Sequence, residues 1–533
     1  MVATRKSRTK RKTRRSKNFN IAVLGKPAGV IQPRVQQVGP ERFGIVAVDC
    51  AKVRSKWMLA DFFGNVLVEP VEVEHHNAGF RQAIVTLKKA VQKCRLEDVI
   101  VGVEMTGIYH KPVFRAFRDG GFETRLVHPF ASSHYRLAEH GDIKTDDNDL
   151  VAIFRAVVNG FGLLEKYVEP IYVQLQILAR HRRDLVKKKS KLQCQIRHHV
   201  HRCLPGFADL FKGDDLWTQR APVPLLRAIA AGGGTPQVVR DAGVSGMTKW
   251  LEDVGVRVHK KTLERIVVWA AKATKPDENA ASYSRVWSSL LDDWSTKRLQ
   301  IQGLQRDLAA LLVKTPYVLL LSHPGINVVS AAELAGEMGS IENYASAKAI
   351  NGRAGLFPSR YQSDEVDRGG NLTRFRNAKL RAAWMLIADN MVKCNAYWMA
   401  KAAAWKQRGV KPCDVRARIA NRLTRTVFTM ISGRQVYHHP SRLDRGYVID
   451  KLLTFHREHK TEPAVIVRDL KHAADMVPTS AHADEATPIK EVRRKSLRSR
   501  KRGPQQLGEL LVGLLARLGV MADDEPCDDI EST

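Results

Sequence analysis

Residues 44–55 read GIVAVDCAKVRS, an apolar run that contains a single carboxylate, Asp49. Residues 56–75 continue in apolar or alternating runs, so the two stretches predict neighbouring strands. Residues 77–94 have apolar side chains at helical spacing, and a short buried strand follows at 98–107. A helix, a strand and a last helix that ends at Gly160 complete the pattern. Strands followed by alternating helices and strands predict an α/β domain, with helices packed on a mixed sheet.

Two longer segments further along the chain carry heptad-like apolar repeats. The positions that recur every seven residues are Ile171, Leu178, Leu185 and Leu192 in the first segment, and Trp287, Trp294, Ile301 and Leu308 in the second. Such repeats predict two long helices that pack as an antiparallel or an intermolecular coiled coil. The first segment is strongly basic, so we expect its outer face to meet nucleic acid.

Composition narrows the class of protein. The 533 residues include 87 Lys and Arg against 55 Asp and Glu, a formal net charge of +32, which indicates a polyanionic partner. The seven cysteines form no C-x-x-C pair, which argues against a disulfide scaffold or a zinc ribbon and favours a reducing compartment. No apolar run reaches the length of about 18 residues that a bilayer crossing requires. We therefore expect a cytoplasmic protein that does not enter membranes.

The same features divide the chain into five parts. In order, we expect a basic disordered arm at 1–43, the α/β domain at 44–165, coiled-coil helices with an insert at 166–315, a compact helical domain at 316–435, and an extension with a basic run, a short amphipathic helix and an acidic tail at 436–533.

Four carboxylates stand where they need a partner. Asp49 lies within one apolar strand and Glu104 ends another, and a lone buried carboxylate costs several kcal/mol. Asp146 and Asp149 are three residues apart at a helix start and therefore share a face. Together they would form a set of oxygen ligands for Mg²⁺ or Mn²⁺. Taken singly, each has a simpler explanation, since a strand Asp can belong to a turn and acids in a first helical turn complement the helix dipole.

The 316–435 domain contains two further candidates. Pro324 and Gly325 make a turn into a helix that resembles a helix-hairpin-helix, whose amides hold a DNA phosphate. Ser363 lies in the turn-rich stretch PSRYQSDEVDRGGN, ahead of the basic residues Arg368, Arg374, Arg376, Lys379 and Arg381. A serine attacks phosphorus only if its proton is removed and the phosphate charge is neutralised, which metals and arginines could do. A solvated loop serine is the simpler alternative.

These motifs resemble one known family. VAVDCAK, VGVEMTGIYH and IKTDDNDL are similar to the first domain of the DEDD-type insertion-sequence transposases, which is RuvC-like with an RNase H-like fold. HPGINVVSAAELAGEMGSIENYASAKAINGRAGLFPSRYQS is similar to the second, transposase domain of the same family. The resemblance covers roughly residues 44–435. Asp364 departs from it, because the family has glycine after the serine.

The resemblance implies a site-specific DNA recombinase. Its acidic tetrad corresponds to Asp49, Glu104, Asp146 and Asp149, and its serine nucleophile to Ser363. Lys144, in the third motif, would join Gly325 and the basic residues after Ser363 in nucleic-acid contact. The family implies Mg²⁺ or Mn²⁺ as cofactor, donor and target DNA as substrates, and a structured non-coding bridge RNA as guide. It also implies a homo-tetramer or dimer, in keeping with the predicted coiled coil.

Two other functions fit the same residues. A RuvC-type structure-selective endonuclease would cut junctions with water, and Ser363 would then be structural. A non-catalytic DNA- or RNA-binding protein would make no use of magnesium or of the acids.

Overall fold

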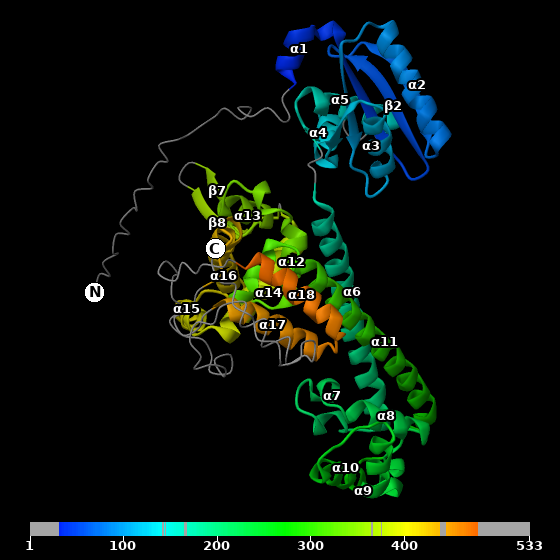
Figure 1. Cartoon of the computed structure of the whole chain (residues 1–533). Coiled ribbons are helices and arrows are strands. Elements are labelled where there is room, and N and C mark those ends of the chain that lie inside the picture. Colours follow the sequence, from blue (N-terminus) through cyan, green and yellow to red (C-terminus); the bar gives the residue numbers. More distant parts are fainter. Residues whose placement is uncertain are drawn as a thin grey trace, which may run out of the picture. The chain divides into compact units, whose positions relative to one another are not determined.

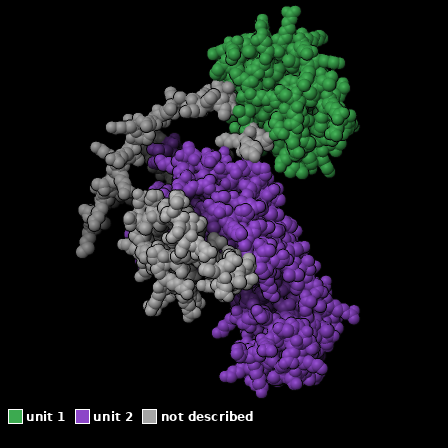
Figure 2. Space-filling view, viewed as in Figure 1, with its two compact units in different colours: residues 1–167 green, residues 168–533 purple. Residues whose placement is uncertain are grey.

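The computed structural model describes residues 31–140, 143, 145–164, 168–363, 366–374, 376–437 and 444–477. The chain divides into two compact units, residues 1–167 (unit 1) and residues 168–533 (unit 2), and each is described by itself (Figure 2). Among the described helices, none combines the length and the apolarity that a bilayer crossing needs.

Unit 1 is built on a six-stranded mixed sheet (Figure 1). The strands are β1 (Phe43–Cys50), β2 (Arg54–Asp61), β3 (Val66–Glu74), β4 (Asp98–Glu104), β5 (Glu123–Val127) and β6 (Gly162–Leu164). Their spatial order is β3-β2-β1-β4-β5-β6, with β4 parallel to both β1 and β5 and the other pairs antiparallel. The predicted α/β domain with a mixed sheet is therefore confirmed.

Helices cover both faces of this sheet. They are α1 (Gln32–Val38), α2 (Asn77–Lys93), α3 (His110–Asp119), α4 (Pro129–His140) and α5 (Asp146–Val158), with a short 3₁₀ helix η1 (Pro40–Arg42) before β1. Alternation along β1 sends Val46 and Val48 into the core under α2 and α3, and Ile45 and Ala47 into the core under α5. A β-carbon at Gly102 of β4 would lie only 2.4 Å from the side chain of Val157, so α5 packs directly on the sheet.

Residues 31–43, which the sequence assigned to a disordered arm, belong to the described structure of unit 1. Ile31 and Val35 are buried in the core, and Arg34 forms ion pairs with Asp98 and Glu123 at 2.6 and 2.7 Å. The predicted disordered arm at 1–43 is therefore wrong for residues 31–43. The helix α1 has seven residues, and only Val35 and its N-cap residue Ile31 are buried, so the apolar pattern is too short to identify from periodicity.

Unit 2 is helical except for one β-ribbon in its described part. Its first half contains α6 (Pro170–Cys203), η2 (Ala208–Leu210), α7 (Asp215–Thr218), α8 (Pro222–Ala231), α9 (Pro236–Glu252), α10 (Lys260–Lys272) and α11 (Ala280–Leu312). Its second half contains η3 (Pro316–Ser322), α12 (Val328–Met338), η4 (Ile341–Asn343), α13 (Ala347–Ala354), β7 (Pro358–Ser363), β8 (Val366–Leu372), α14 (Ala378–Cys394), α15 (Ala396–Gln407), α16 (Pro412–Ser432), α17 (Asp444–Glu458) and α18 (Pro463–Met476).

The two heptad segments form the long helices α6 and α11, which pack against each other within the chain (Figure 1). All four repeat positions of the second segment are buried. The pair is antiparallel, because Tyr172 near the start of α6 shares a core with Leu312 at the end of α11, while Cys203 at the end of α6 bonds to the carbonyl of Ala280. The insert between the helices, whose fold the sequence did not reveal, is a cluster of helices that shares one core with the end of α6 and the start of α11.

The predicted boundaries at 315 and 435 are not boundaries of the fold. The first turns of α6 share one apolar core with the helices of 316–435 and with α17 and α18, to which Leu452 and Leu470 contribute. The apolar faces of α17 and α18 are short and follow a loosened composition, so the sequence assigned them to an extension. The basic run at 493–502, the leucine-rich helix and the acidic tail lie outside the described residues.

Candidate functional site

The parallel pairing of β1 and β4 sets the first two carboxylates side by side. Val48 lies opposite Val103 in the register, so the next residues along the two strands are Asp49 and Glu104. Both side chains are half-buried. Because the strands run in the same direction, both acids lie at the carboxyl end of the sheet, where polar side chains of α/β folds commonly gather.

The helix α5 supplies the other two carboxylates. Thr145 caps the helix by accepting a hydrogen bond from the backbone N–H of Asn148 at 3.2 Å, so that Asp146 and Asp149 occupy the first turn. Asp149 is only 5% exposed, because the turn packs toward β1. Asp147 turns away and pairs with Lys56 of β2 at 2.5 Å.

The four predicted acids are close enough to repel one another. Burial, the largest cause, and the negative charges of Glu104, Asp149 and Asp146, in that order, together raise the pKa of Asp49 to about 6. A hydrogen bond between the side chains of Asp49 and Glu104 adds to the shift. We name Asp49, Glu104, Asp146 and Asp149 the carboxylate cluster.

Two neighbours from α4, which the sequence did not predict, offset part of this charge. Arg136 donates to Asp149 at 2.5 Å, and the hydroxyl of Ser132 donates to Glu104. Thr106 also donates to Glu104, at 3.2 Å. Nothing in the sequence between β5 and α5 identifies Arg136 or Ser132, because both depend on where α4 packs.

The chemistry of the cluster fits a divalent cation. Its donors are oxygens, the ligand type that Mg²⁺ and Mn²⁺ prefer, and the mutual repulsion at Asp49 is what a cation would relieve. In the part of the chain that the structure describes, however, no three His, Cys, Asp or Glu side chains are arranged closely enough to hold a metal ion. Arg136 is the cation that Asp149 contacts instead.

Ser363 ends the first strand of an exposed β-ribbon. All six residues of β7 are exposed, and Ser363 pairs with Val366 across the tip of the ribbon. Its hydroxyl has no hydrogen-bond partner among the described residues. Ser359, the other serine of this strand, instead donates to the carbonyl of Asn371 at 2.9 Å. The serine predicted in a turn thus lies at a strand end, with its hydroxyl open to a substrate.

The predicted basic residues have different surroundings. Arg374 and Arg376 are exposed after the ribbon. Arg381 donates to three backbone carbonyls, those of Ala354, Gly355 and Thr373, and so fastens the base of the ribbon to the end of α13. Lys379 lies in the first turn of α14. Lys144 and the side chain of Arg368 lie outside the described residues.

The Pro324–Gly325 turn connects η3 to α12. Gly325 has φ +95°, a left-handed conformation that suits glycine, and a β-carbon there would lie 3.0 Å from the sulfur of Met391. Asn327 caps α12 in a capping box with Ser330. Lys451 of α17 donates to the carbonyls of His323 and Ile326, each at 2.9 Å, and holds the turn closed from one side.

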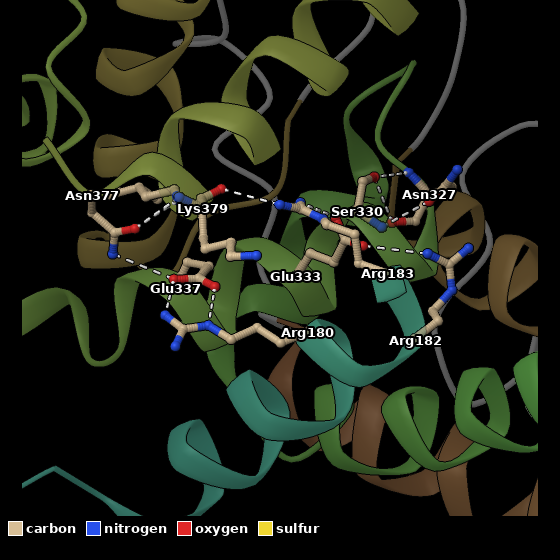
Figure 3. A network of polar contacts seen from close by, with 10 residues as sticks. Arg180, Arg182, Arg183, Asn327, Ser330, Glu333, Glu337, Asn377 and Lys379 are labelled. Carbon is tan, nitrogen blue, oxygen red and sulfur yellow. Dashed lines mark hydrogen bonds and ion pairs between the residues drawn. The ribbon is translucent and has the colours of Figure 1, made fainter. Parts of the chain in front are cut away.

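A buried ionic network, which sequence reasoning missed, joins α6 to α12 (Figure 3). Glu337 accepts two hydrogen bonds from Arg180 at 2.8 and 2.9 Å, and Glu333 pairs with Arg183 at 2.8 Å and Arg182 at 3.3 Å. Asn377, the N-cap of α14, donates to Glu337 at 3.4 Å. The network therefore connects α6 to the helix that follows the serine ribbon.

Comparison with known proteins gives two matching family models and one relative. Residues 46–205 match a model described as "Transposase", and residues 317–404 match "Transposase IS116/IS110/IS902 family". An "Insertion element IS110 uncharacterized 43.6 kDa protein" of Streptomyces coelicolor is 22% identical over 333 residues, which are 62% of this chain and 80% of the relative. The first match contains the carboxylate cluster and the second contains Ser363, while most of the insert and everything after 404 lie outside both.

Proposed function

Because this chain belongs to the IS116/IS110/IS902 family of transposases, we propose that it moves an insertion element by serine-dependent, metal-assisted strand exchange guided by an RNA. Membership implies a DNA substrate and a DNA-cleaving and rejoining activity. The serine nucleophile, the metal, the guide and the assembly are our proposals. The observation that carries them is that the charges of Glu104, Asp146 and Asp149 all act on Asp49, in a protein of net charge +32.

The carboxylate cluster is the proposed metal site. Asp49, Glu104, Asp146 and Asp149 would hold Mg²⁺ or Mn²⁺, which, when bound, would stabilise negative charge on the reacting phosphate. The sheet order and the helix α5 packed across it support the RNase H-like fold expected from the resemblance. For all four acids to turn toward a cation, Asp149 would have to exchange its contact with Arg136.

Ser363 is the proposed nucleophile. Its Oγ would form a bond to the phosphorus of the DNA backbone, one P–O bond of the DNA would break, and the departing oxygen would leave as a hydroxyl group. A carboxylate would accept the serine proton, and the departing oxygen would take up a proton from water. The exposure of Ser363 and its lack of a hydrogen-bond partner among the described residues support this role, since a committed hydroxyl would first have to be released.

The guide and the assembly follow from the family resemblance. We propose that a structured non-coding RNA pairs with donor and target DNA, so that base pairing and not this chain reads the sequence. We further propose a dimer or tetramer in which one copy supplies Ser363 to the carboxylates of another. Since α6 and α11 pair with each other in the described chain, any coiled-coil contact between copies would use their outer faces.

The test is a search for a covalent protein–DNA adduct. The full chain is incubated with element-end DNA, the non-coding RNA that flanks the element, and Mg²⁺, and the products are separated under denaturing conditions. We expect an adduct that Ser363→Ala and Asp49→Asn abolish and that the matched Ser359→Ala variant retains. Nicked DNA without an adduct, undiminished in Ser363→Ala, would favour a water-using endonuclease, and binding without any cleavage would favour a non-catalytic binder.

A further inference from the structure

The segment from Lys393 to Arg425 is the site of a second, unassigned surface. It contains nine Lys and Arg residues and one acid, Asp414, so that its net charge is 9 − 1 = +8 over 33 residues. Most of this segment lies beyond the part of the chain that the family models match. Such a density of one charge in a folded region is costly unless a polyanion balances it.

Three arginines of α16 form one stripe of this surface. Arg418, Arg422 and Arg425 are exposed and lie four and three residues apart, which places them on the same helix face. Among the described residues, none of the three has a carboxylate partner. Arg416, on another face of the helix, is by contrast paired with Asp389 at 3.3 Å. The stripe therefore presents guanidinium groups that are free to meet phosphates.

Aromatic side chains of α15 lie beside this stripe. The guanidinium carbons of Arg422 and Arg418 are 4.9 and 5.9 Å from the ring centre of Trp405. Lys401 lies 4.5 Å over the ring of Tyr397. Tyr397, Lys401 and Trp405 are four residues apart in turn and share a face of α15. We call the surface formed by Tyr397, Lys401, Trp405, Arg418, Arg422 and Arg425 the α15–α16 patch.

The patch is joined to the base of the serine ribbon. Asn421, which lies between Arg418 and Arg422 in the sequence, donates to the carbonyl of Leu356 at 2.9 Å. Thr424, one turn further along, donates to Asn351 of α13 at 3.1 Å. Leu356 lies two residues before β7 begins. The same helix thus carries the arginine stripe and holds the root of the ribbon that ends at Ser363.

We propose that the α15–α16 patch binds an unpaired stretch of the DNA strand that Ser363 attacks. Alternating aromatic and cationic groups suit a single strand, whose bases stack on rings while its phosphates pair with cations. A duplex would offer phosphates but no base faces. The connection through Asn421 favours the substrate strand over a separate RNA, since the helix that carries the stripe also holds the residues just before the ribbon. The strand's identity rests on the proposed function, whereas binding by the patch can be measured without it.

The test compares oligonucleotide binding by matched variants of the full chain. Fluorescence anisotropy would measure affinity for a labelled 20-nucleotide single-stranded DNA, the duplex of the same sequence and the corresponding RNA. The variants are Arg418→Gln/Arg422→Gln, which leaves the ring in place, and Trp405→Leu. The control is Lys88→Gln/Lys89→Gln on α2, which removes the same charge from two exposed lysines that lack ion-pair partners among the described residues.

For the double arginine variant we expect the affinity for single-stranded DNA to fall roughly tenfold or more. The slope of log affinity against log salt concentration should become shallower by about 1.4, that is, about 0.7 for each of the two lost phosphate contacts. Trp405→Leu should weaken single-strand binding more than duplex binding, and the control should change neither by more than about twofold. An equal loss for duplex and single strand, a loss confined to RNA, or no loss in the double variant would overturn the proposal.

The proposed function can fail separately. Ser363→Ala should form no adduct but should bind the single strand as the wild type does. A wild-type protein that binds the single strand through the patch but forms no adduct would refute the chemistry alone. The double arginine variant should also lower adduct yield at subsaturating DNA and recover it at high DNA concentration. If the adduct forms normally while the patch binds no single strand, only the present inference is refuted.

Discussion

Buried carboxylates occur in both units, in opposite surroundings. In unit 1 the charges of Glu104, Asp146 and Asp149 all act on Asp49, and Arg136 forms an ion pair with Asp149. In unit 2, Glu333 and Glu337 are each 3% exposed and are matched by three arginines from α6. A buried charge is tolerated when it is paired, and an excess of like charge is retained at functional sites. The second arrangement stabilises the fold, and the first leaves negative charge for a cation.

The largest expected effect on stability comes from breaking the ion pairs of Glu333. Glu333→Gln would remove the partner of Arg182 and Arg183, whose side chains are 17% and 19% exposed, and burial already lowers the pKa of Arg182. Leaving guanidinium groups buried and unpaired should lower the free energy of unfolding by about 3–5 kcal/mol. Urea denaturation would measure this, with the exposed Glu342→Gln as control. A loss below about 1 kcal/mol would show that the pairs do not hold α6 to α12.

The carboxylate cluster should respond in the opposite direction, because its like charges repel one another. Asp49 has a folded-state pKa of about 6 against an ordinary value of 3.8, so the folded protein binds this proton more tightly than the unfolded chain. Its contribution to stability is therefore fully present below about pH 4 and lost as pH rises through 6, by on the order of 3 kcal/mol in total. In buffer that contains EDTA, the Asp49→Asn protein should be more stable than the wild type at pH 8. The same substitution should abolish the activity.

The pH dependence of stability separates relief of charge repulsion at Asp49 from a change in packing caused by the substitution. The stability advantage of Asp49→Asn should grow between pH 4 and pH 7 and level off above that range, because only the ionised Asp49 is repelled by its neighbours. Urea titrations at a series of pH values would follow it. An advantage that does not change with pH would mean that packing, and not charge repulsion, distinguishes the variant.

The sequence singled out the acids of the carboxylate cluster but not Glu333 and Glu337. Asp49 and Glu104 stand out because each interrupts an apolar strand, and the spacing of Asp146 and Asp149 places them on one helix face. Glu333 and Glu337 lie in α12, which reads as an ordinary apolar helix, and their arginine partners are some 150 residues away in the chain. Pairing over such a distance depends on tertiary packing, which periodicity does not report.

The dependence on tertiary packing also explains why the ribbon, the helix α4 and the pairing of α6 with α11 were not fully predicted. The sequence predicts a turn-rich loop where the ribbon β7–β8 lies, because all six residues of β7 are exposed and no apolar alternation marks them as a strand. The helix α4, which brings Arg136 and Ser132 to the cluster, has polar residues on most of its faces. The heptads predict the long helices α6 and α11, but whether the pair forms within one chain or between chains depends on the insert that connects them.

Binding of Mg²⁺ to the carboxylate cluster should change stability by a smaller amount. If the carboxylate cluster binds Mg²⁺, the wild type should gain about 1.4 kcal/mol of stability at a free Mg²⁺ concentration ten times the Kd. Asp49→Asn should gain much less, and Glu333→Gln should gain as much as the wild type because its acids do not contribute. Thermal unfolding with increasing MgCl₂, against matched NaCl for ionic strength, would measure the gain. Equal gains in the wild type and Asp49→Asn would place the ion elsewhere.

Ser363→Ala should have the smallest effect on stability. It therefore tests whether the proposed nucleophile contributes to the stability of the fold. The side chain is exposed at the tip of the ribbon and donates to no described group, so its loss should change the free energy of unfolding by less than about 0.5 kcal/mol. Ser359→Ala, which removes the hydrogen bond to Asn371 beside Gly370, should cost about 0.5–1.5 kcal/mol. The adduct assay should reverse this order, with Ser363→Ala inactive and Ser359→Ala active. A Ser363→Ala protein that unfolds markedly more easily would give the serine a structural role, because the loss of an uncommitted hydroxyl has no other reason to destabilise the ribbon.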